Sequence, residues 1–315
     1  MYIHSISFVI PCYRSEHTIY DVVMELEDKL KELKIVEYEI ILVNDCSPDN
    51  VWGKILKLCD DNIKIKGVLL AKNFGQHAAL LAGYSCANND IVISFDDDGQ
   101  APINELELLL NKIDEGYDVV YAYYEAVRQG MFRRFGTLMA AKMGQIMIGI
   151  PKDFKFSTFC VMKKYVVDEM LKYTNPYPYL PGLVFRTTRN ITSVLTHQRN
   201  RAYGSSSYKF SSLLKLWMNG FTAFSIKPIR FGTMMGMGLS AIGFIIAVIL
   251  IINKIIEPNI AVGWTSIISA ILIMGGLILA MLGLVGEYIG RIYISINNSP
   301  QYVIKEIITG KNNDN

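Results

Sequence analysis

The chain contains 315 residues with a formal net charge of +2, and 51% of them are hydrophobic. A chain of this length suits about two units of roughly 100–200 residues each. The near-neutral charge excludes a broad nucleic-acid-binding surface, whereas a mean hydropathy of +0.27 is high for a soluble enzyme. None of the five cysteines forms a C-x-x-C pair, and no basic region precedes the first apolar run. We therefore expect reduced thiols in a cytosolic compartment and no signal peptide.

Short apolar runs alternate with helical patterns through the N-terminal part of the chain. The runs, each expected to form a strand, are Ile6–Ile10, Glu39–Val43, Lys66–Leu70 and Asp90–Phe95, and the first is expected to stop at Pro11. Helical patterns cover about 17–34, 50–60 and 76–87. Strands of this length that alternate with helices predict βαβ units and a parallel sheet, so the expected fold class is α/β.

Three polar clusters follow the expected strands: Pro11–Glu16, Asn44–Asp49 and Asp96–Gln100. In a parallel sheet of this kind, ligands bind beyond the carboxyl ends of the strands. The three clusters are therefore predicted to meet and to form the binding site.

The most informative motif is the acidic turn FDDDGQ, which closes the last of these runs. Its alternate residues Asp96, Asp98 and Gln100 can direct their oxygen atoms to one point, and Mg²⁺ often binds through one or two carboxylates plus substrate phosphates. Such an ion would neutralise charge on a departing diphosphate. The alternative is a solvated acidic loop, since Pro102 and Glu105 indicate a helix that Asp98 would merely help to cap.

Two amphipathic stretches follow, at about 129–150 and 206–228. Apolar residues recur there at a spacing of three to four, with basic residues between them, Arg133 and Arg134 among these. Such a stripe is commonly a core face. The basic residues and the neighbouring apolar runs instead favour helices that lie in a membrane interface.

Phe231–Ile252 and Pro258–Gly286 contain no charged residue, and each run exceeds the ~20 apolar residues that a helix needs to span a bilayer. The alternative is a pair of buried core helices. Because the link between the runs is short, the two expected spans, at about 231–253 and 261–286, would form a hairpin. The basic residues that flank this hairpin are Lys227, Arg230, Arg291 and Lys305. They predict that both of its ends lie in the cytoplasm.

Several segments resemble, in the same order, the motifs of family 2 glycosyltransferases. SFVIPCYRSEHTI is similar to the first strand and turn, usually VIPxYNE, and EIILVNDCSPDN is similar to the VDDGSxD nucleotide turn. LLAKNFGQHAALLAGY resembles the RNxGxxxAxxxG segment, and FDDDGQAP resembles the DxDxQxP metal turn. The ending GLVGEYIGRIYISINNSPQYVI resembles the polyprenyl-phosphate branch. This branch includes bactoprenol glucosyltransferases, undecaprenyl-phosphate aminoarabinose transferases and dolichyl-phosphate mannose synthases.

This resemblance covers nearly the whole chain and implies its architecture. It implies a Rossmann-like GT-A nucleotide-sugar domain with a mostly parallel sheet, then amphipathic interface helices and two transmembrane helices. The expected boundaries are a GT-A domain at 1–205, a juxtamembrane helix at 206–228, a transmembrane hairpin at 229–290 and a cytoplasmic tail at 291–315. The branch further implies a multi-pass protein of the inner membrane with a cytoplasmic catalytic domain, and a homo-oligomer, by resemblance a tetramer.

The resemblance also implies roles for residues of the donor site. Those that would bind the nucleotide are Pro11, Tyr13, Glu16, Asp45 and Asp96, with Asp45 on the base or ribose. Asp96, Asp98 and Gln100 would hold Mg²⁺ or Mn²⁺ on the diphosphate.

A second group would lie near the acceptor phosphate: Arg133, Arg134, Arg201, Ser206 and Tyr208. The last three belong to RAYGSSSY, which resembles the RxxGxSxY segment. Asp98 and Arg201 would be the catalytic residues, although Arg201 has an alternative interpretation as a surface arginine.

Three positions depart from the family pattern. Asn44 stands at the first aspartate of VDDGS, and Ser207 replaces a frequent lysine or asparagine. Ser157-Thr158 replaces a Gly-Asp pair that supplies the usual candidate base, and Asp153 is nearby but out of register. A lipid phosphate is already an anionic nucleophile, so positioning and charge stabilisation could carry the reaction without a base. On this reasoning Thr158→Val is expected to cost little.

The leading hypothesis is an inverting transferase that moves one sugar from a nucleotide diphosphate, UDP before GDP, to a polyprenyl phosphate such as undecaprenyl phosphate, for cell-envelope glycan or lipid modification. A processive polysaccharide synthase would carry QxxRW, but Ala202 follows Gln198-Arg-Asn-Arg201. A nucleotidyltransferase would carry GxGxR after the first strand, which VIPCYRSE lacks. A non-catalytic membrane adaptor would not need the intact FDDDGQ. No motif specifies the sugar.

Overall fold

The computed structural model describes residues 5–124, 151, 154–155, 157–175, 178–197, 227–256, 263–296 and 300–310. The predicted interface helix at 129–150 lies outside these residues, as does the juxtamembrane stretch up to residue 226. The chain divides into two compact units, Met1–Trp217 with Asn298–Asn315, and Met218–Asn297. The first unit therefore contains segments from both sides of the second.

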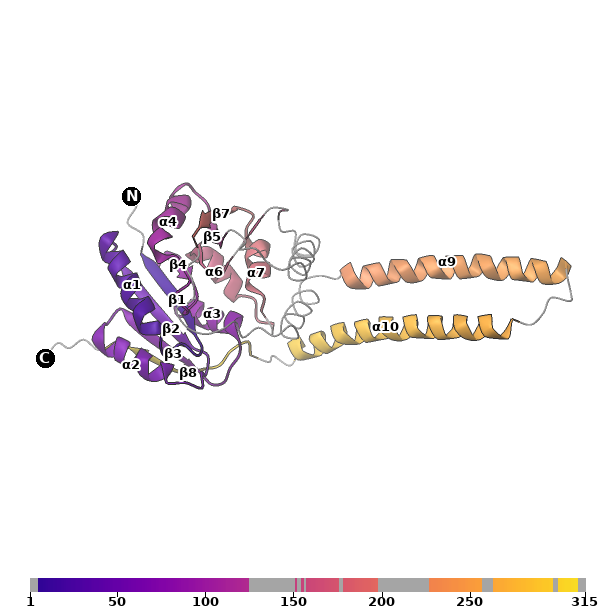
Figure 1. The fold of residues 1–315 in the computed structure, drawn as a ribbon, viewed down its shortest axis with the longest axis horizontal. Coiled ribbons are helices and arrows are strands. Elements are labelled where there is room, and N and C mark those ends of the chain that lie inside the picture. Colours follow the sequence, from indigo (N-terminus) through magenta and orange to yellow (C-terminus); the bar gives the residue numbers. More distant parts are fainter. Residues whose placement is uncertain are drawn as a thin grey trace. The chain divides into compact units, whose positions relative to one another are not determined.

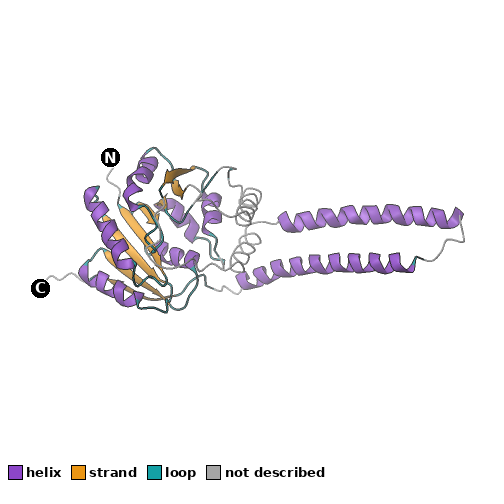
Figure 2. Cartoon of the chain, viewed as in Figure 1, coloured by secondary structure: helices purple, strands orange, loops and turns teal. Residues whose placement is uncertain are grey.

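The first unit is built on one eight-stranded sheet, in the order β7-β5-β6-β4-β1-β2-β3-β8 (Figures 1 and 2). The strands are β1 Ile6–Cys12, β2 Tyr38–Asn44, β3 Ile65–Leu70, β4 Ile91–Ser94, β5 Val119–Tyr124, β6 Cys160–Lys163, β7 Ile191–Thr196 and β8 Ile304–Thr309. Among the strands that the structure describes, β6 and β8 run antiparallel to the others. The predicted mostly parallel α/β sheet is confirmed.

Helices connect the strands on both faces of the sheet. They are α1 Ile19–Glu32, α2 Val51–Asp61, α3 Gln76–Ser85, the 3₁₀ turn η1 Ile103–Glu105, α4 Leu106–Asp114, α6 Lys164–Leu171 and α7 Leu180–Thr187. The three helices predicted between the first four strands are present, with ends shifted by a few residues. Apolar residues of α1, α2 and α4 pack with alternate residues of β1 and β2 in one continuous core. The opposite side of β1 and β2 contacts α3.

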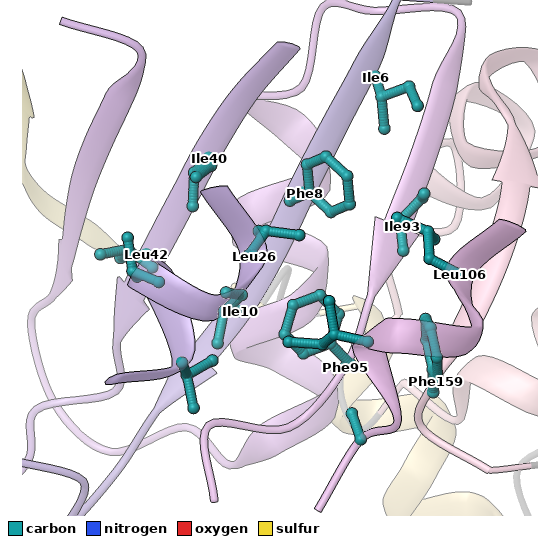
Figure 3. Packing of buried hydrophobic residues seen from close by; sticks show 14 of the residues in the cluster. Ile6, Phe8, Ile10, Leu26, Ile40, Leu42, Ile93, Phe95, Leu106 and Phe159 are labelled. Carbon is teal, nitrogen blue, oxygen red and sulfur yellow. The ribbon is translucent and has the colours of Figure 1, made fainter. Parts of the chain in front are cut away.

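Aromatic rings fill the core beneath the carboxyl ends of the central strands (Figure 3). Phe95 is 1% exposed, and its ring packs edge-on against both Phe8, at a centroid distance of 6.5 Å, and Phe159, at 5.7 Å. Such pairs contribute about 0.5–1.5 kcal/mol each beyond their buried area. Because Phe95 directly precedes the acidic turn, its packing fixes where that turn begins.

The first strand continues past its predicted end at Pro11. Ile6 donates its N–H to Glu37, and Cys12 accepts the N–H of Asp45, so even-numbered residues of β1 hydrogen-bond toward β2. Pro11 therefore faces the β4 side, where pairing has already ended at Val9. The missing N–H of proline removes no sheet hydrogen bond there, which is why the strand tolerates it.

Residues after the second unit form part of the sheet and are not a separate tail, which corrects the boundary expected at 291. Strand β8 pairs antiparallel with β3, and Ile308 packs against the core. Ahead of it, Val303 accepts the N–H of Ala71 at 2.9 Å, and Gln301 donates to the carbonyl of Tyr173 at 2.7 Å. This C-terminal segment is thus anchored to the first unit at several points.

The second unit contains two long helices, α9 Lys227–Ile256 and α10 Trp264–Ile296, which contact each other. Gly232 is buried, and a Cβ at that position would collide with the side chain of Met281. The helices overlap the two spans predicted at about 231–253 and 261–286, and α10 continues ten residues beyond the second. Among the residues that the structure describes, none of the helices has the combination of length and apolar character needed to cross a membrane.

Gly83 provides a test of how tightly α3 packs on the sheet. A Cβ at Gly83 would collide with Val9 and would stand 2.9 Å from Val43 Cγ2. Alanine improves helix propensity by about 1 kcal/mol over glycine, but overpacking of a core typically costs about 1–3 kcal/mol. We expect Gly83→Ala to lower the thermal unfolding midpoint of the full chain. Adding Val9→Ala should make the double variant less destabilised than the sum of the two single variants, and strictly additive losses would contradict this packing.

Candidate active site

The three polar clusters predicted at the strand ends meet at the carboxyl ends of the central strands. They follow β4, β1 and β2, which are neighbours in that order. The backbone N–H of Tyr13 donates to Asp97 Oδ2 at 2.9 Å, which joins the first cluster to the acidic turn. The N–H of Arg14 donates to Ser47 Oγ at 2.7 Å, which joins it to the second. The predicted convergence is confirmed.

Glu16 links the first turn to the helix that follows the second. Its carboxylate accepts the N–H of Asn50 at 2.7 Å, just before α2, and its own N–H donates to Asp49 Oδ2 at 3.0 Å. Asn44, the departure from the family pattern, accepts the N–H of Ser47 at 2.9 Å. An amide oxygen suffices for this turn, because the bond needs an acceptor and no charge. Both side chains therefore hold the turns of the candidate site in place, while contact of Glu16 with a nucleotide stays a prediction.

Asp45 is buried and holds the loop that leads into α3. Its two carboxylate oxygens accept the N–H groups of Phe74 at 2.7 Å and Gly75 at 2.8 Å. Burial raises the pKa of Asp45, and these two hydrogen bonds offset only part of the rise. A contact between Asp45 and a base or ribose stays a prediction. Such a contact would use carboxylate lone pairs other than those that accept the N–H groups of Phe74 and Gly75.

Asp97 is a site residue that the sequence analysis passed over. Burial and, to a lesser degree, the charge of Asp96 raise the pKa of Asp97 to about 7, and the hydrogen bond from the Tyr13 N–H offsets part of the rise. The Thr18 hydroxyl also donates to the carbonyl oxygen of Asp97 at 2.7 Å. The signal was available, since three consecutive aspartates cannot all point to one ion. The middle residue instead ties the acidic turn to the loop between β1 and α1.

Asp96 is held by neutral donors from two other elements. Gln76 Nε2, in the first turn of α3, donates to Oδ1 at 2.5 Å, and the Thr158 hydroxyl, just before β6, donates to Oδ2 at 2.6 Å. Asp98 Oδ1 accepts the N–H of Gln100 at 3.1 Å. Asp96, Asp98 and Gln100 thus lie on one turn at the carboxyl end of β4, as expected.

Tyr124, at the end of β5, is a further site residue absent from the predicted set. Burial raises the pKa of Tyr124 to about 12, a hydrogen bond with Ser157 lowers it, and the charges of Asp96 and Asp98 add to the rise. The phenol therefore stays protonated beside the acidic turn. Sequence spacing could not reveal this neighbour, because Tyr124 reaches the site through the pairing of β5 with β6.

The oxygen-rich turn fits a divalent cation such as Mg²⁺ or Mn²⁺. Within the described ranges no group of three His, Cys, Asp or Glu side chains is arranged to hold a metal by itself. Mg²⁺ usually binds through one or two carboxylates and completes its octahedron with water and substrate phosphates. Asp96 and Asp98 meet that requirement, and three protein carboxylates are not needed.

The residues predicted around the acceptor phosphate lie outside the described residues: Arg133, Arg134, Arg201, Ser206 and Tyr208. The same applies to Asp153. Of the nucleotide-site predictions, Pro11 is buried as the penultimate residue of β1, while Tyr13 is 42% exposed at the mouth of the site. An exposed ring at that position is available to a ligand.

Solved structures with a similar fold include two of glucosyl-3-phosphoglycerate synthase from Mycobacterium tuberculosis. The structure in complex with Mn²⁺ and UDP-glucose is 17% identical, covers 70% of this chain and 77% of that chain, and gives a TM-score of 0.50. The structure with Mn²⁺, UDP and glucosyl-3-phosphoglycerate is 18% identical, covers 68% and 76%, and also gives 0.50. At these identities the likeness concerns the fold.

Family models cover both units of the chain. Residues 227–292 match the GtrB C-terminal hairpin. Residues 7–171 match the glycosyl transferase family 2 model, which spans more than half of the 315 residues and includes all three polar turns. The chain therefore belongs to glycosyl transferase family 2, in the polyprenyl-phosphate branch, and it is a glycosyltransferase.

Proposed function

We propose that this glycosyltransferase moves one sugar from a nucleotide diphosphate donor, a UDP-sugar before a GDP-sugar, to a polyprenyl phosphate such as undecaprenyl phosphate, with inversion. The observation that carries the proposal is the junction of three polar turns at the carboxyl ends of β4, β1 and β2. That junction combines a site for a nucleotide with an acidic turn suited to a metal-bound diphosphate. The product would serve cell-envelope glycan or lipid modification.

The donor half of the proposal rests on the acidic turn. A divalent ion held by Asp96, Asp98 and Gln100 would neutralise the charge that develops on the departing diphosphate. Both similar structures contain Mn²⁺ with UDP or UDP-glucose, which favours UDP over GDP and makes Mn²⁺ a reasonable first choice of ion. Tyr13 and the wall formed by Glu16 and Asp49 would then enclose the nucleotide.

The acceptor half needs no side-chain base. A phosphate oxygen of the lipid is already anionic, so it can attack the anomeric carbon as the bond to the diphosphate breaks, with no proton to remove. The Thr158 hydroxyl donates to Asp96, so it has the orientation of a donor and not of a proton acceptor. Arg201, with Arg133, Arg134, Ser206 and Tyr208, would bind the acceptor phosphate, since a guanidinium can grip phosphate through two parallel hydrogen bonds.

A location at the inner membrane is supported by the second unit. Counted over the full sequence, Phe231–Ile252 and Pro258–Gly286 carry no charge, and each is longer than the ~20 residues of a typical span. Large apolar side chains on both helices are exposed, among them Phe244 at 71% and Ile278 at 63%. Exposed apolar surfaces of this kind mark sites of interaction with a protein or a membrane, and we propose that lipid covers these helices.

The sheet also constrains the topology. Strand β8 follows the second unit in the chain and yet pairs with β3 in the first. If α9 and α10 cross a bilayer, the chain must therefore return to the side from which it left. The basic residues outside the hairpin favour the cytoplasm for that side. A homo-oligomer, by family resemblance a tetramer, belongs to the same proposal, and no nucleic-acid partner is expected.

The proposed reaction predicts that turnover depends on the lipid. We expect purified protein to consume a UDP-sugar and to form a glycolipid only when undecaprenyl phosphate is present. The measurement is a panel of UDP- and GDP-sugars with and without the lipid, scored for released nucleotide and for glycolipid. Release of nucleotide without lipid, or growth of a polysaccharide chain, would contradict single transfer to a polyprenyl phosphate.

The metal assignment predicts a large effect at Asp98. Asp98→Asn removes a charged oxygen ligand at nearly constant volume and should reduce turnover by at least about a hundredfold, the scale of losing an electrostatic stabiliser. Excess EDTA should abolish wild-type activity, and Mn²⁺ or Mg²⁺ should restore it. Full activity of the variant, or of the wild-type protein in EDTA, would refute the assignment.

The hairpin predicts opposite locations for two reporter fusions. A reporter at Asn315 should lie in the cytoplasm, because the neighbouring strand β8 belongs to the catalytic sheet. A reporter at Glu257, in the link between the two uncharged runs, should lie on the other side. Paired alkaline phosphatase and green fluorescent protein fusions measure this directly. The same location for both would exclude the hairpin.

A further inference from the structure

We infer that Thr158 and Gln76 are positioning residues that together orient the Asp96 carboxylate for the donor and its metal. The inference rests on the proposed function, because it concerns how that site holds its ligands. Thr158 stands where family resemblance places a candidate base, and the inference gives this residue a positioning role instead. The inference gives the same role to Gln76, for which the sequence analysis predicted no function.

The geometry supports a two-sided clamp on Asp96. Gln76 binds one carboxylate oxygen at 2.5 Å and Thr158 binds the other at 2.6 Å, so the plane of the carboxylate is defined from both ends. A carboxylate held by one donor can still rotate about its χ2 torsion, whereas two donors from different elements leave it one orientation. Neither of these two donors carries a charge, so neither contributes a positive charge that would compete with a cation.

Thr158 is itself supported by buried neighbours. Thr158 directly precedes Phe159, whose ring packs against Phe95, the residue directly before Asp96. The aromatic contact therefore sets the Thr158 and Asp96 backbones side by side. In addition, the buried Tyr84 hydroxyl donates to Ser94 Oγ at 2.9 Å, and Ser94 Oγ donates to the Thr158 carbonyl at 3.4 Å.

Helix α3 contributes to both hydrogen bonds that hold Asp96. Gln76 lies in its first turn and Tyr84 in its last, so the helix holds Asp96 directly at one end and braces Thr158 through Ser94 at the other. The close fit of Gly83 against the sheet keeps this helix in place. Hydrogen bonds thus hold the backbone that carries the Thr158 hydroxyl, and this hydroxyl binds Asp96, which argues that its loss has a functional cost.

This network changes the expectation for Thr158→Val. If Thr158 only occupied the position of an absent catalytic base, replacing it with valine would have little effect on activity. A residue that orients a metal-binding carboxylate should behave as other outer-shell partners do, whose loss typically weakens metal affinity about 10–100-fold. Thr158→Val should therefore weaken binding of Mn²⁺ by at least about tenfold.

The experiment measures Mn²⁺ binding to the full-length protein in the presence of UDP, from the electron paramagnetic resonance signal of free Mn²⁺. Thr158→Ser keeps the hydroxyl and should bind within about threefold of wild type, whereas Thr158→Val and Gln76→Met should each bind much more weakly. In steady-state kinetics, both weak variants should raise KM for the UDP-sugar and leave KM for the lipid phosphate nearly unchanged.

Thr188→Val is the matched control. Its hydroxyl donates to Asp118 Oδ2 at 3.0 Å, which is the same kind of threonine–aspartate hydrogen bond. Asp118, however, lies at the amino-terminal end of β5, whereas the candidate site lies at the carboxyl ends of the strands. We expect this variant to keep wild-type Mn²⁺ affinity. An equal loss of affinity in Thr188→Val and Thr158→Val would show a general loss of stability and would overturn the inference.

Two further outcomes separate the inference from the function on which it rests. Wild-type affinity for Mn²⁺ in Thr158→Val, or a rise in KM for the lipid phosphate alone, overturns the positioning role and leaves the proposed function intact. Failure of the wild-type protein to bind Mn²⁺ with UDP overturns the proposed metal site, and the inference with it. Rescue by serine together with weak binding by valine and by Gln76→Met supports the inference.

Discussion

Phe95 is the last buried residue of its segment before three aspartates, and its ring contacts those of Phe8 and Phe159. These contacts join β1 to the segments that follow β4 and precede β6, and those two segments carry Asp96 and Thr158 of the candidate site. The carboxylates of such a turn repel one another, so the turn needs support from a rigid apolar core if it is to keep one conformation without a cation. The aromatic cluster provides that support. Because Phe95 precedes Asp96 and Phe159 follows Thr158, the packing of the rings determines where these two polar residues lie.

Hydrogen bonds then decide what each aspartate does. Asp97 faces the loop after β1, Asp45 holds the loop before α3, and Asp96 is clamped by Gln76 and Thr158. Only part of the acidic set is therefore directed to a ligand. Burial is the main cause that raises the pKa of Asp97 to about 7, and the neighbouring charge of Asp96 adds to the rise. A cation at Asp96 and Asp98 would offset that charge, which agrees with the proposed use of Mn²⁺ or Mg²⁺.

The C-terminal strand β8 belongs to the first unit, although it follows the second unit in the chain. Val303 and Gln301 hydrogen-bond to residues of the first unit before β8 joins β3. Ala71, the partner of Val303, opens the loop whose later residues Phe74 and Gly75 are held by Asp45. The segment that follows the second unit in the chain is therefore attached to the loop that Asp45 holds at the candidate site.

The sequence by itself determined the α/β class, the strands and helices of the first half, and the meeting of three polar turns, because apolar periodicity and turn residues are local properties. It placed the end of β1 two residues early and described β8 as part of a tail, since the pairing of a strand depends on neighbours that the local pattern does not contain. Only the tertiary structure decided the partners of each carboxylate. Thr158 and Asp96 are 62 positions apart, Gln76 and Asp96 are 20 apart, and such contacts arise from sheet order and helix packing, which bring distant residues within the 2.5–3 Å at which a hydrogen bond forms.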